Sequence, residues 1–380
     1  MFKEKVTVVV FEGGGAATEI EEQMLSVRKG IALDNIKKAL SVSNIDEVIL
    51  STNYPDLADR AEAAGARIDV THQDTFHFGR HLCQVVTEYE LDNVIYLGGA
   101  ALPLVRESDF FDISRQLRQF KNVVVVNNVQ SADLIAFTPS DVLEHIEPPD
   151  NDNLLGYLLR EAGLRRILIE NSARINFDLD TPVDMLILDE CSSLGENTRG
   201  SLDELNPSTG HLVEAMEVLS TSQRPYPEVV LLGRVGPAIM SVINANLGVR
   251  LRVFSEERGM KALQRAESGK AVSLLGYLLQ NTGPEEFFEY LNQVADVAFL
   301  DTRVLFAHMK LFPSAGDRYY SDLGMVARID DPYVARFTEV AFNAPLPVVL
   351  GGHSLVYGGL WSIMEEWGLL NHGMPSMPTS

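Results

Sequence analysis

Two aspartates, Asp178 and Asp180, stand two residues apart just before a predicted helix. In an extended segment alternate side chains point to the same side, so both carboxylates can face one bound cation. Carboxylate oxygens are the ligands that Mg²⁺ prefers, and a bound Mg²⁺ can hold phosphate oxygens. A simpler interpretation also fits these residues, in which Asp178 is a polar surface residue and Asp180 or Thr181 only caps the helix.

The helix expected over 183–189 would give the two acids a rigid support. Thr181 suits the N-cap position, Pro182 suits the first helical position and Asp184 suits the first turn. The apolar residues that follow predict that this helix is anchored on a core.

The first strand is predicted over Val6–Phe11, whose β-branched and apolar residues suit burial on both faces. Glu12 and a run of three glycines follow it, and such a loop lets the backbone approach a phosphate or a nucleobase closely. The spacing fits neither the dinucleotide fingerprint nor the P-loop, and a tight turn explains the glycines equally well. The helical pattern over 18–40 that comes next is expected to break near Gly30.

Strands and helices alternate through the first half of the chain, which predicts an open, largely parallel sheet covered by helices. Ligands of such sheets bind beyond the carboxyl ends of the strands. Three glycine-rich or polar segments are expected at those ends, namely 12–17, 98–104 and 176–181.

The second half repeats the pattern with four predicted parallel strands. Its first strand, glycine turn and helix, with acids at the tip of the next strand, are together similar to half of a dinucleotide-binding unit that has too few glycines. Several polar residues are expected at the carboxyl ends of these strands and form a second candidate site. Capped strand ends or ion pairs would explain each of them singly. These residues are Arg234, Glu256, Asp301, Arg303, His353 and Ser354.

Composition limits the classes of function. The 380 residues suffice for two domains, and 46% hydrophobic residues supply their cores. A net charge of −22 argues against nucleic acid as a partner, although a small anion could bind through backbone N–H groups, basic residues or a metal. No apolar run reaches ~18 residues and the N-terminus is unlike a secretory signal, so we expect a cytoplasmic protein that does not span a membrane. The two cysteines exclude a disulfide scaffold.

Three of these pieces together carry a family resemblance: the glycine-rich loop after the first strand, the segment Tyr96–Leu104 and the segment Phe177–Asp184. In this order they resemble the nucleotidyltransferases of the nucleotide-diphospho-sugar transferase superfamily. The closest types in pattern are molybdenum-cofactor guanylyltransferase and phospholactate guanylyltransferase. The resemblance covers about residues 5–190, and the second half resembles no family in this way.

The resemblance implies a fold and a site. For 1–190 it implies a three-layer α/β domain with a sheet like that of these transferases (GT-A-like). The strand and helix pattern of the second half itself predicts another three-layer α/β domain with a Rossmann-like parallel sheet over 228–368, joined by a linker with a helix over 191–227 and followed by a tail over 369–380. Asp178 and Asp180 would be the acids that hold Mg²⁺ or Mn²⁺. The nucleotide would lie against Glu12, Gly13, Gly14, Gly15, Gly98 and Gly99.

Two departures from the family pattern bear on activity. The family has an arginine a few residues into the first loop, whereas this loop continues with Ala16, Ala17 and acidic residues. Arg28 or Lys29 is the candidate substitute that would stabilise the leaving pyrophosphate. The family also places an aspartate before the Pro-Leu of the middle segment, where this chain has Leu102 before Pro103.

These observations lead to three hypotheses. The first is a metal-dependent nucleotidyltransferase that moves a nucleoside monophosphate from a nucleoside triphosphate to a small phosphorylated acceptor. The second is a nucleotide- or nucleotide-sugar-binding protein without transferase turnover, which the two departures favour. The third is a glycosyltransferase whose Asp178-Leu-Asp180 pair holds a nucleotide-sugar donor. Neither a nucleic acid nor a membrane is expected as a partner, and a homo-oligomer is compatible with each hypothesis.

Overall fold

The computed structural model describes residues 4–71, 76–130, 132–205, 210–221 and 226–370. Its contacts divide the chain into two compact units, and neither unit is one continuous half. The stretch predicted as a linker over 191–227 is shared between both units. Unit 1 contains Met1–Asp180, Ser193–Asn206 and Gly259–Ser268, and unit 2 contains Thr181–Ser192, Pro207–Arg258 and Gly269–Ser380.

Unit 1 is built on a seven-stranded sheet with the order β3-β2-β1-β4-β6-β5-β7. Every neighbouring pair is parallel except the two pairs that involve β6, which runs antiparallel to β4 and β5. The prediction of a largely parallel sheet is confirmed. The strands are β1 (Val6–Glu12), β2 (Glu47–Thr52), β3 (Arg67–Val70), β4 (Asn93–Gly98), β5 (Val123–Val126), β6 (Leu134–Thr138) and β7 (Arg165–Leu168).

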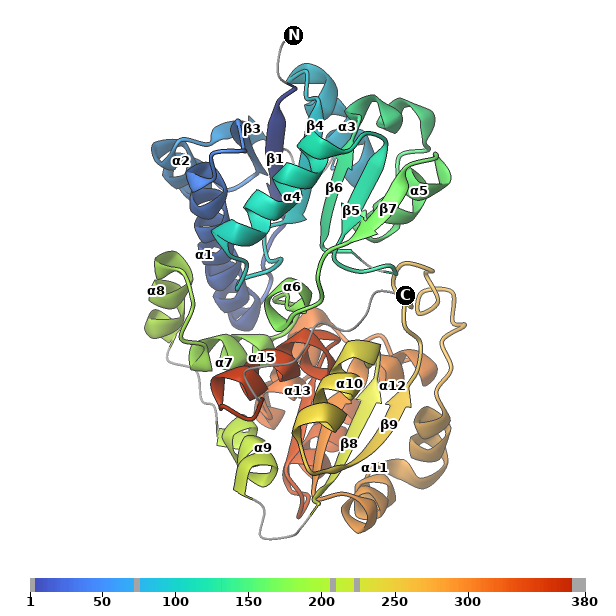
Figure 1. The fold of residues 1–380 in the computed structure, drawn as a ribbon. Helices are drawn as coiled ribbons and strands as arrows, with labels where there is room; N and C mark the ends of the chain where they lie inside the picture. The colour runs from blue at the N-terminus through green and yellow to red at the C-terminus, as the bar shows by residue number, and fades with distance from the viewer. Residues whose placement is uncertain (1–3, 72–75, 131, 206–209, 222–225, 371–380) are drawn as a thin grey trace. The chain divides into compact units, whose positions relative to one another are not determined.

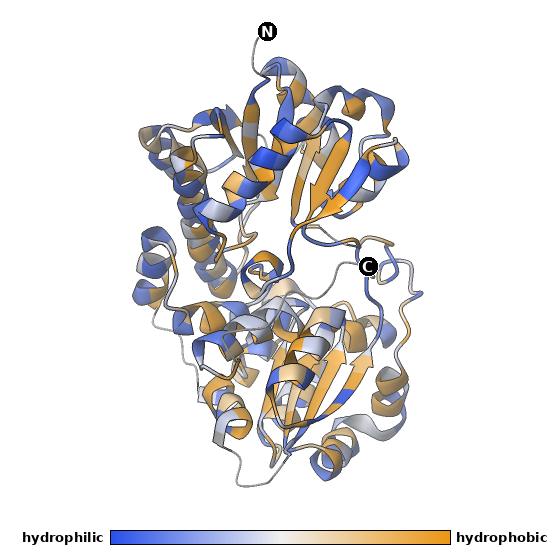
Figure 2. Ribbon diagram, in the orientation of Figure 1, coloured by the Kyte–Doolittle hydropathy of each residue, from blue (hydrophilic) through white to orange (hydrophobic). Residues whose placement is uncertain are grey.

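Helices cover both faces of this sheet, which gives three layers (Figure 1). Alternate residues of β1 face two different cores, one on each side of the sheet. Val8 and Val10 pack with α1, α2 and α4. Val9 packs with α3 and α5. Figure 2 shows the strands of unit 1 as predominantly hydrophobic, as burial on both faces requires. The helices are α1 (Glu19–Ser41), α2 (Pro55–Ala64), α3 (Phe78–Glu88), α4 (Glu107–Gln119), α5 (Leu155–Glu161), α6 (Ala173–Asn176) and α8 (Glu196–Leu205), with 3₁₀ helices over Ser140–His145 and Asp152–Leu154.

Helix α1 runs without interruption through Gly30, so the predicted break at this residue is wrong. The glycine allows another segment to approach the helix closely, because a Cβ atom there would lie 2.8 Å from the carbonyl oxygen of Asn197 at the start of α8. One turn further on, the carboxylate of Asp34 accepts the backbone N–H groups of Asn197 and Thr198 at 3.1 and 2.8 Å. Asp34 therefore supplies the cap that the first turn of α8 needs.

Unit 2 contains a four-stranded sheet with the order β11-β10-β8-β9, in which every pair is parallel. The prediction of a second parallel α/β sheet is confirmed. The strands are β8 (Glu228–Gly233), β9 (Arg250–Ser255), β10 (Val297–Asp301) and β11 (Val348–Gly351).

The helices of unit 2 include α7, which starts as the sequence predicts. Asp184 accepts hydrogen bonds from the backbone N–H and the hydroxyl of Thr181 at 2.7 and 3.0 Å, and Pro182 is the first helical residue. Aromatic contacts of Phe337 with Phe288 and Phe306 join α14 to α11 and α12. The helices are α7 (Pro182–Glu190), α9 (Gly210–Thr221), α10 (Pro237–Asn246), α11 (Leu274–Val294), α12 (Thr302–His308), α13 (Ala315–Asp322), α14 (Pro332–Phe342) and α15 (Gly358–Glu366), with 3₁₀ helices over Val326–Arg328 and Ser354–Val356.

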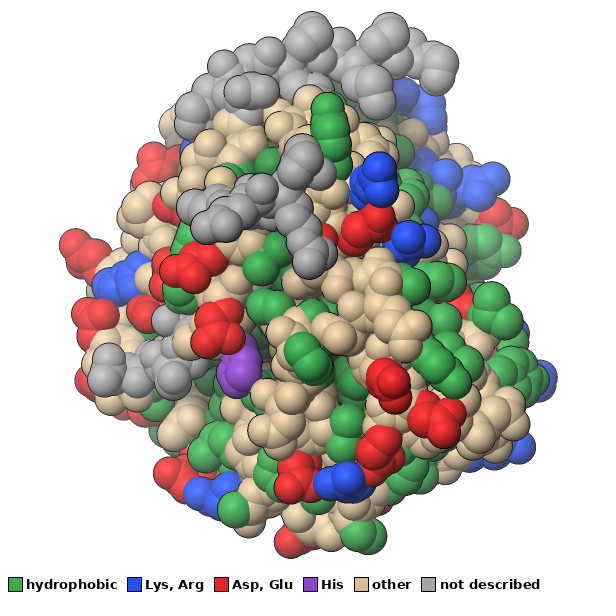
Figure 3. All heavy atoms as spheres, turned by 90° about the horizontal axis from the view of Figure 1, so that it is seen from below, with side chains coloured by type: hydrophobic (Ala, Val, Ile, Leu, Met, Phe, Trp, Pro, Cys, Tyr) green, Lys and Arg blue, Asp and Glu red, His purple; other side chains and the backbone are tan. Residues whose placement is uncertain are grey.

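No helix within the described ranges is both long enough and apolar enough to cross a membrane. The face of the molecule in Figure 3 carries acidic side chains that are spread over it rather than gathered in one place. This distribution agrees with the net charge of −22.

Candidate functional site

The glycine loop after β1 is held in place by Asn53, which follows β2. The side-chain oxygen of Asn53 accepts the backbone N–H of Gly14, and its amide nitrogen donates to the carbonyl oxygen of the same residue, both at 3.0 Å. Gly14 has a φ of +124°, a conformation that favours glycine. Gly13 and Gly15 are exposed, so the loop offers a fixed, accessible backbone. Asn53 is not among the residues predicted from the sequence, where its only local sign is the polar end of its strand.

The middle segment lies directly beside this loop. The N–H of Gly99 donates to the carbonyl oxygen of Phe11 at 2.8 Å. A Cβ atom on Gly99 would lie 2.2 Å from the Oε2 atom of Glu12, so the close approach requires glycine at this position. At Gly98, by contrast, no heavy atom of the described structure lies within 4 Å of the position that a Cβ atom would take.

The segment with the two acids joins the same edge of the sheet. Asp178 forms an antiparallel bridge with Ala101, and the N–H of Leu179 donates to the carbonyl oxygen of Ala100 at 3.1 Å. Leu179 is buried, whereas Asp178 is half-buried and Asp180 is exposed. The alternation places the two carboxylates on the side opposite to Leu179. The three segments predicted at the carboxyl ends of the strands are therefore neighbours along one edge.

Arg28 and Lys29 lie on α1, and each already pairs with a carboxylate. The Nη2 atom of Arg28 is 2.8 Å from Oε1 of Glu12, whose side chain is 1% exposed. Burial raises the pKa of Glu12 above its ordinary value, although the Arg28 guanidinium opposes this shift. Lys29 binds Asp56 at 2.8 Å, and its ammonium group lies 4.4 Å from the centre of the Tyr54 ring.

Asp133 and Asp152 form a group of acids that no local sequence pattern predicts. Burial, together with the charges of Asp180 and Asp152, raises the pKa of Asp133 to about 7. Asp152 accepts a hydrogen bond from the hydroxyl of Tyr96 at 3.2 Å. Asp133 precedes β6, and because β6 is antiparallel its first residue, Leu134, pairs with Leu97 near the carboxyl end of β4. If β6 ran parallel to β4, its first residue would lie at the opposite edge of the sheet, and Asp133 would lie there with it.

The six residues proposed from the sequence as a second site lie in unit 2, where most of them bind one another or a helix. Arg234 donates to Asp301 at 2.6 Å, and Asp301 is fully buried. Burial raises and the Arg234 guanidinium lowers the pKa of Asp301, with a net shift below its ordinary value. Arg303 makes two hydrogen bonds of 2.6 Å to Asp322.

The remaining residues of that second set also have structural partners. Glu256 accepts the N–H of Leu274 at 2.7 Å and the hydroxyl of Ser273 at 2.5 Å, and it thereby caps α11. His353 stacks on Tyr357 with ring centres 5.6 Å apart. Ser354 is 1% exposed, so its hydroxyl is poorly placed to meet a ligand from solution.

A scan against protein-family models found no match, and a search of curated proteins found none either. Solved structures do resemble part of the chain. A cytidylyltransferase from Leptospira borgpetersenii aligns at 17% identity over 53% of this chain and 93% of its own, with a TM-score of 0.40.

Two further structures align in a similar way. CMP:2-keto-3-deoxy-manno-octonic acid synthetase complexed with CTP has 20% identity over 44% of this chain and 90% of its own, with a TM-score of 0.34. A Mycobacterium tuberculosis protein complexed with manganese has 18% identity over 43% of this chain and 88% of its own, with a TM-score of 0.30. At these scores and identities, the likeness assigns neither an activity nor a substrate to this chain.

The fit of a divalent cation can be judged from the donors at the edge. Among the described residues, no group of three or more His, Cys, Asp and Glu side chains is arranged to hold a metal ion. Mg²⁺ differs from Zn²⁺ in that it commonly takes one or two carboxylates and completes its shell with water and substrate phosphates. A pair of carboxylates on one side of an extended segment, as at Asp178 and Asp180, fits that requirement.

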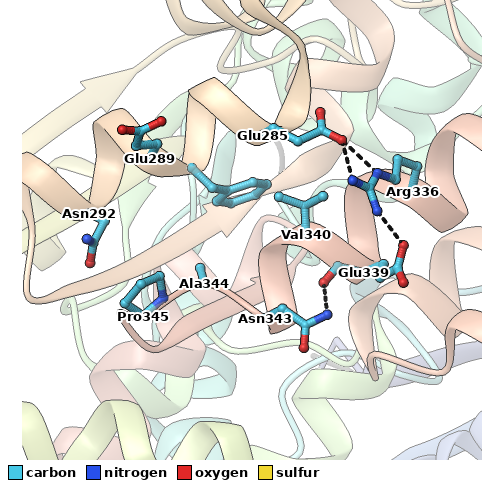
Figure 4. Close-up of a pocket in the computed structure, with 10 residues that line it drawn as sticks. Glu285, Glu289, Asn292, Arg336, Glu339, Val340, Asn343, Ala344 and Pro345 are labelled. Atoms are coloured by element: carbon cyan, nitrogen blue, oxygen red, sulfur yellow. Dashed lines mark hydrogen bonds and ion pairs between the residues drawn. The ribbon is translucent and has the colours of Figure 1, made fainter.

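A pocket of about 350 Å³ lies elsewhere, between α11 and α14 of unit 2 (Figure 4). Arg336 lies between Glu285 and Glu339 and pairs with them at 2.6 and 2.7 Å. Glu289 also lines this pocket, so its net charge is negative and suits a phosphate ligand poorly.

Proposed function

We propose that the chain is a nucleotidyltransferase that binds a nucleoside triphosphate at the carboxyl edge of the unit 1 sheet. The observation that carries the proposal is the continuous set of backbone contacts from Phe11 through Gly99 and Ala100 to Leu179. These contacts hold a glycine loop, a second glycine-containing segment and a pair of acids along one edge, which is where α/β sheets bind ligands.

In the proposed reaction, an oxygen of the acceptor attacks the α-phosphorus of the nucleotide. A new P–O bond forms, the bond from the α-phosphorus to the bridging oxygen breaks, and pyrophosphate leaves with the electron pair. An acceptor that carries a phosphate is already ionised at neutral pH, so it needs no protein base. The protein then acts mainly by positioning and by charge stabilisation.

Each part of the edge has a proposed role. The exposed backbone of Gly13 and Gly15 would donate hydrogen bonds to phosphate oxygens or to the base, and Asn53 holds the loop in the required conformation. Asp178 and Asp180 would hold a Mg²⁺ or Mn²⁺ ion, which neutralises charge on the phosphate oxygens when it is bound. Gly98 and Gly99 would complete the nucleotide side of the edge, and Glu12, whose side chain is buried against Arg28, could contribute only its backbone.

A second candidate function is nucleotide binding without transfer. The observation that favours it is the ion pair between Arg28 and Glu12, because an arginine committed to a buried carboxylate is less available to a leaving pyrophosphate. The same reasoning applies to Lys29, which holds Asp56. In this case nucleotides would bind at the same edge but turnover would be absent. The glycosyltransferase hypothesis stays a prediction that free nucleoside diphosphate among the products would support.

A binding measurement followed by a turnover measurement tests these alternatives. Each of the four nucleoside triphosphates would be titrated by calorimetry with MgCl₂ in excess over the nucleotide and then incubated with a panel of phosphorylated acceptors. Binding with pyrophosphate release supports transfer, and binding without release for any acceptor supports the second function. Absence of binding for all four nucleotides contradicts both.

A further inference from the structure

The side chain of Asn127 joins two segments of unit 1. Asn127 directly follows β5, which runs in the same direction as β4, so it lies at the carboxyl edge of the sheet. Its Oδ1 atom accepts the backbone N–H groups of Asp133 and Leu134 at 3.1 and 3.3 Å. Its Nδ2 atom donates to the carbonyl oxygen of Ile175 at 2.9 Å. One amide therefore ties the start of β6 to α6, the helix that precedes the acid pair.

Helix α6 has four residues, so its carbonyl groups find no partners within the helix and its position depends on contacts from other elements. The amide of Asn127 supplies the partner of the Ile175 carbonyl. Arg174 supplies a second tie, because its Nε and Nη2 atoms lie 2.9 and 3.0 Å from the two carboxylate oxygens of Asp109 in α4. Side chains from β5 and α4 therefore fix α6 at two points.

Only a few residues separate these ties from the acid pair. Asp178 is the third residue after Ile175, and Phe177, which is 1% exposed, lies between them. On the other side of Asp178, the N–H of Leu179 donates to the carbonyl oxygen of Ala100 at 3.1 Å. The backbone is thus held both before and after Asp178. Loss of the anchor at α6 would leave the acid segment held only at Ala100 and Ala101, so the carboxylates could take a wider range of positions.

We infer that Asn127 and Arg174 are positioning residues of the metal site, which hold α6 so that Asp178 and Asp180 face one cation. This inference rests on the proposed function and names two side chains that act through the acid segment without touching the metal or the nucleotide. Residues that orient metal ligands in this way typically change metal affinity by about 10–100-fold when they are removed. The affinity for the cation therefore depends on hydrogen bonds made outside the acid segment itself.

The test measures binding of Mn²⁺ alone to the full chain by electron paramagnetic resonance, which distinguishes free from bound ion and needs no knowledge of the nucleotide. Asn127→Ala removes the tie without adding a charge, and we expect it to bind Mn²⁺ about tenfold more weakly than wild type. Asn93→Ala is the matched control. Asn93 is 1% exposed and donates to the carbonyl oxygen of Lys5 at 2.7 Å, but it lies at the amino end of β4. Its loss should lower the free energy of unfolding and leave Mn²⁺ affinity unchanged.

Wild-type affinity in Asn127→Ala would overturn the inference. An equal loss of affinity in Asn93→Ala would also overturn it, because the effect would then follow stability rather than position. If Asn127→Ala does not fold, Arg174→Gln decides instead. This substitution removes a positive charge, which by itself favours a bound cation, so weaker Mn²⁺ binding would have to come from lost positioning. Binding as tight as that of wild type, or tighter, would overturn the inference.

Asp178→Asn separates this inference from the proposed function, because it removes a proposed metal ligand directly and should abolish Mn²⁺ binding. If wild type binds no Mn²⁺, or if Asp178→Asn binds it as tightly as wild type, the metal site of the proposed function is contradicted and the inference falls with it. Loss of binding in Asp178→Asn, together with wild-type affinity in Asn127→Ala, contradicts the inference alone.

Discussion

The backbone N–H of Leu179 donates to the carbonyl oxygen of Ala100 at 3.1 Å. This bond joins segments almost eighty positions apart in the chain and, with the bridge between Asp178 and Ala101, sets which way the acids face. In the same segment as Ala100, the N–H of Gly99 donates to the carbonyl oxygen of Phe11, which lies just before the glycine loop. The relative placement of the acids and the loop therefore depends on backbone contacts, which are less easily disturbed than side-chain contacts.

Gly99→Ala should disturb this arrangement. The added Cβ atom would lie 2.2 Å from Oε2 of Glu12, so the buried carboxylate or the segment must move. We expect a loss of about 1–3 kcal/mol in the free energy of unfolding, the usual cost of overpacking, together with weaker nucleotide binding. Urea denaturation measures the first quantity. Gly200→Ala is the control, because the structure has open space at that glycine of α8, and equal stability of both variants would refute the close contact.

Asp34→Ala should loosen α8. The substitution removes a carboxylate that accepts two backbone N–H groups and the hydroxyl of Thr198, the last at 2.7 Å. We expect a loss of about 1–2 kcal/mol, as for other N-cap residues, and faster amide hydrogen exchange at Asn197 and Thr198. Asp203→Ala removes an exposed carboxylate from the same helix and should change neither quantity appreciably. Unchanged exchange in Asp34→Ala would show that the cap contributes nothing.

Arg28→Ala should leave Glu12 buried without its ion-pair partner. We expect a loss of about 1–3 kcal/mol near pH 7, since a buried polar group that loses its partner keeps its desolvation cost. The loss should shrink as pH falls, because the pKa of Glu12 is raised and protonation removes the charge that needs Arg28. Denaturation at several pH values measures this trend. The exposed Lys37→Ala is the control, and a deficit for Arg28→Ala that grows at low pH would contradict the expectation.

The contribution of Asp133 to the free energy of unfolding should fall as pH rises. Its pKa is raised from 3.8 to about 7, so between these values the folded protein holds a proton that the unfolded chain has released. The favourable contribution is complete below about pH 4 and is lost as pH rises through about 7. Asp133→Asn lacks this dependence, so its stability relative to wild type should increase over that range. Parallel pH profiles for both proteins would show that Asp133 titrates normally.

The sequence predicted the strands and the helix starts well where local chemistry decides them. Thr181, Pro182 and Asp184 start α7 as expected, because each favours its own position at a helix N-terminus. Gly30 was misread, since a glycine that permits close approach of Asn197 looks the same in sequence as one that ends a helix. That distinction depends on a partner more than 160 positions away.

The candidate site was harder to predict than the fold. The sequence drew attention to three segments that the structure brings together along one edge, because each follows a recognisable strand. Asp133 was missed because β6 reverses direction, which carries the start of that strand to the edge. Asp152 was missed because it lies in the short 3₁₀ helix Asp152–Leu154 and meets Tyr96 of β4 only through a tertiary contact. Neither residue has a local pattern that marks it.

The most direct test of the central claim is a crystal structure of the full chain with a non-hydrolysable nucleoside triphosphate and MgCl₂ or MnCl₂. Our account predicts phosphate density within hydrogen-bonding distance of the Gly13–Gly15 backbone and a metal ion on Asp178 and Asp180. Phosphates bound instead near Arg234 or Arg303 in unit 2, with the unit 1 edge empty, would contradict it.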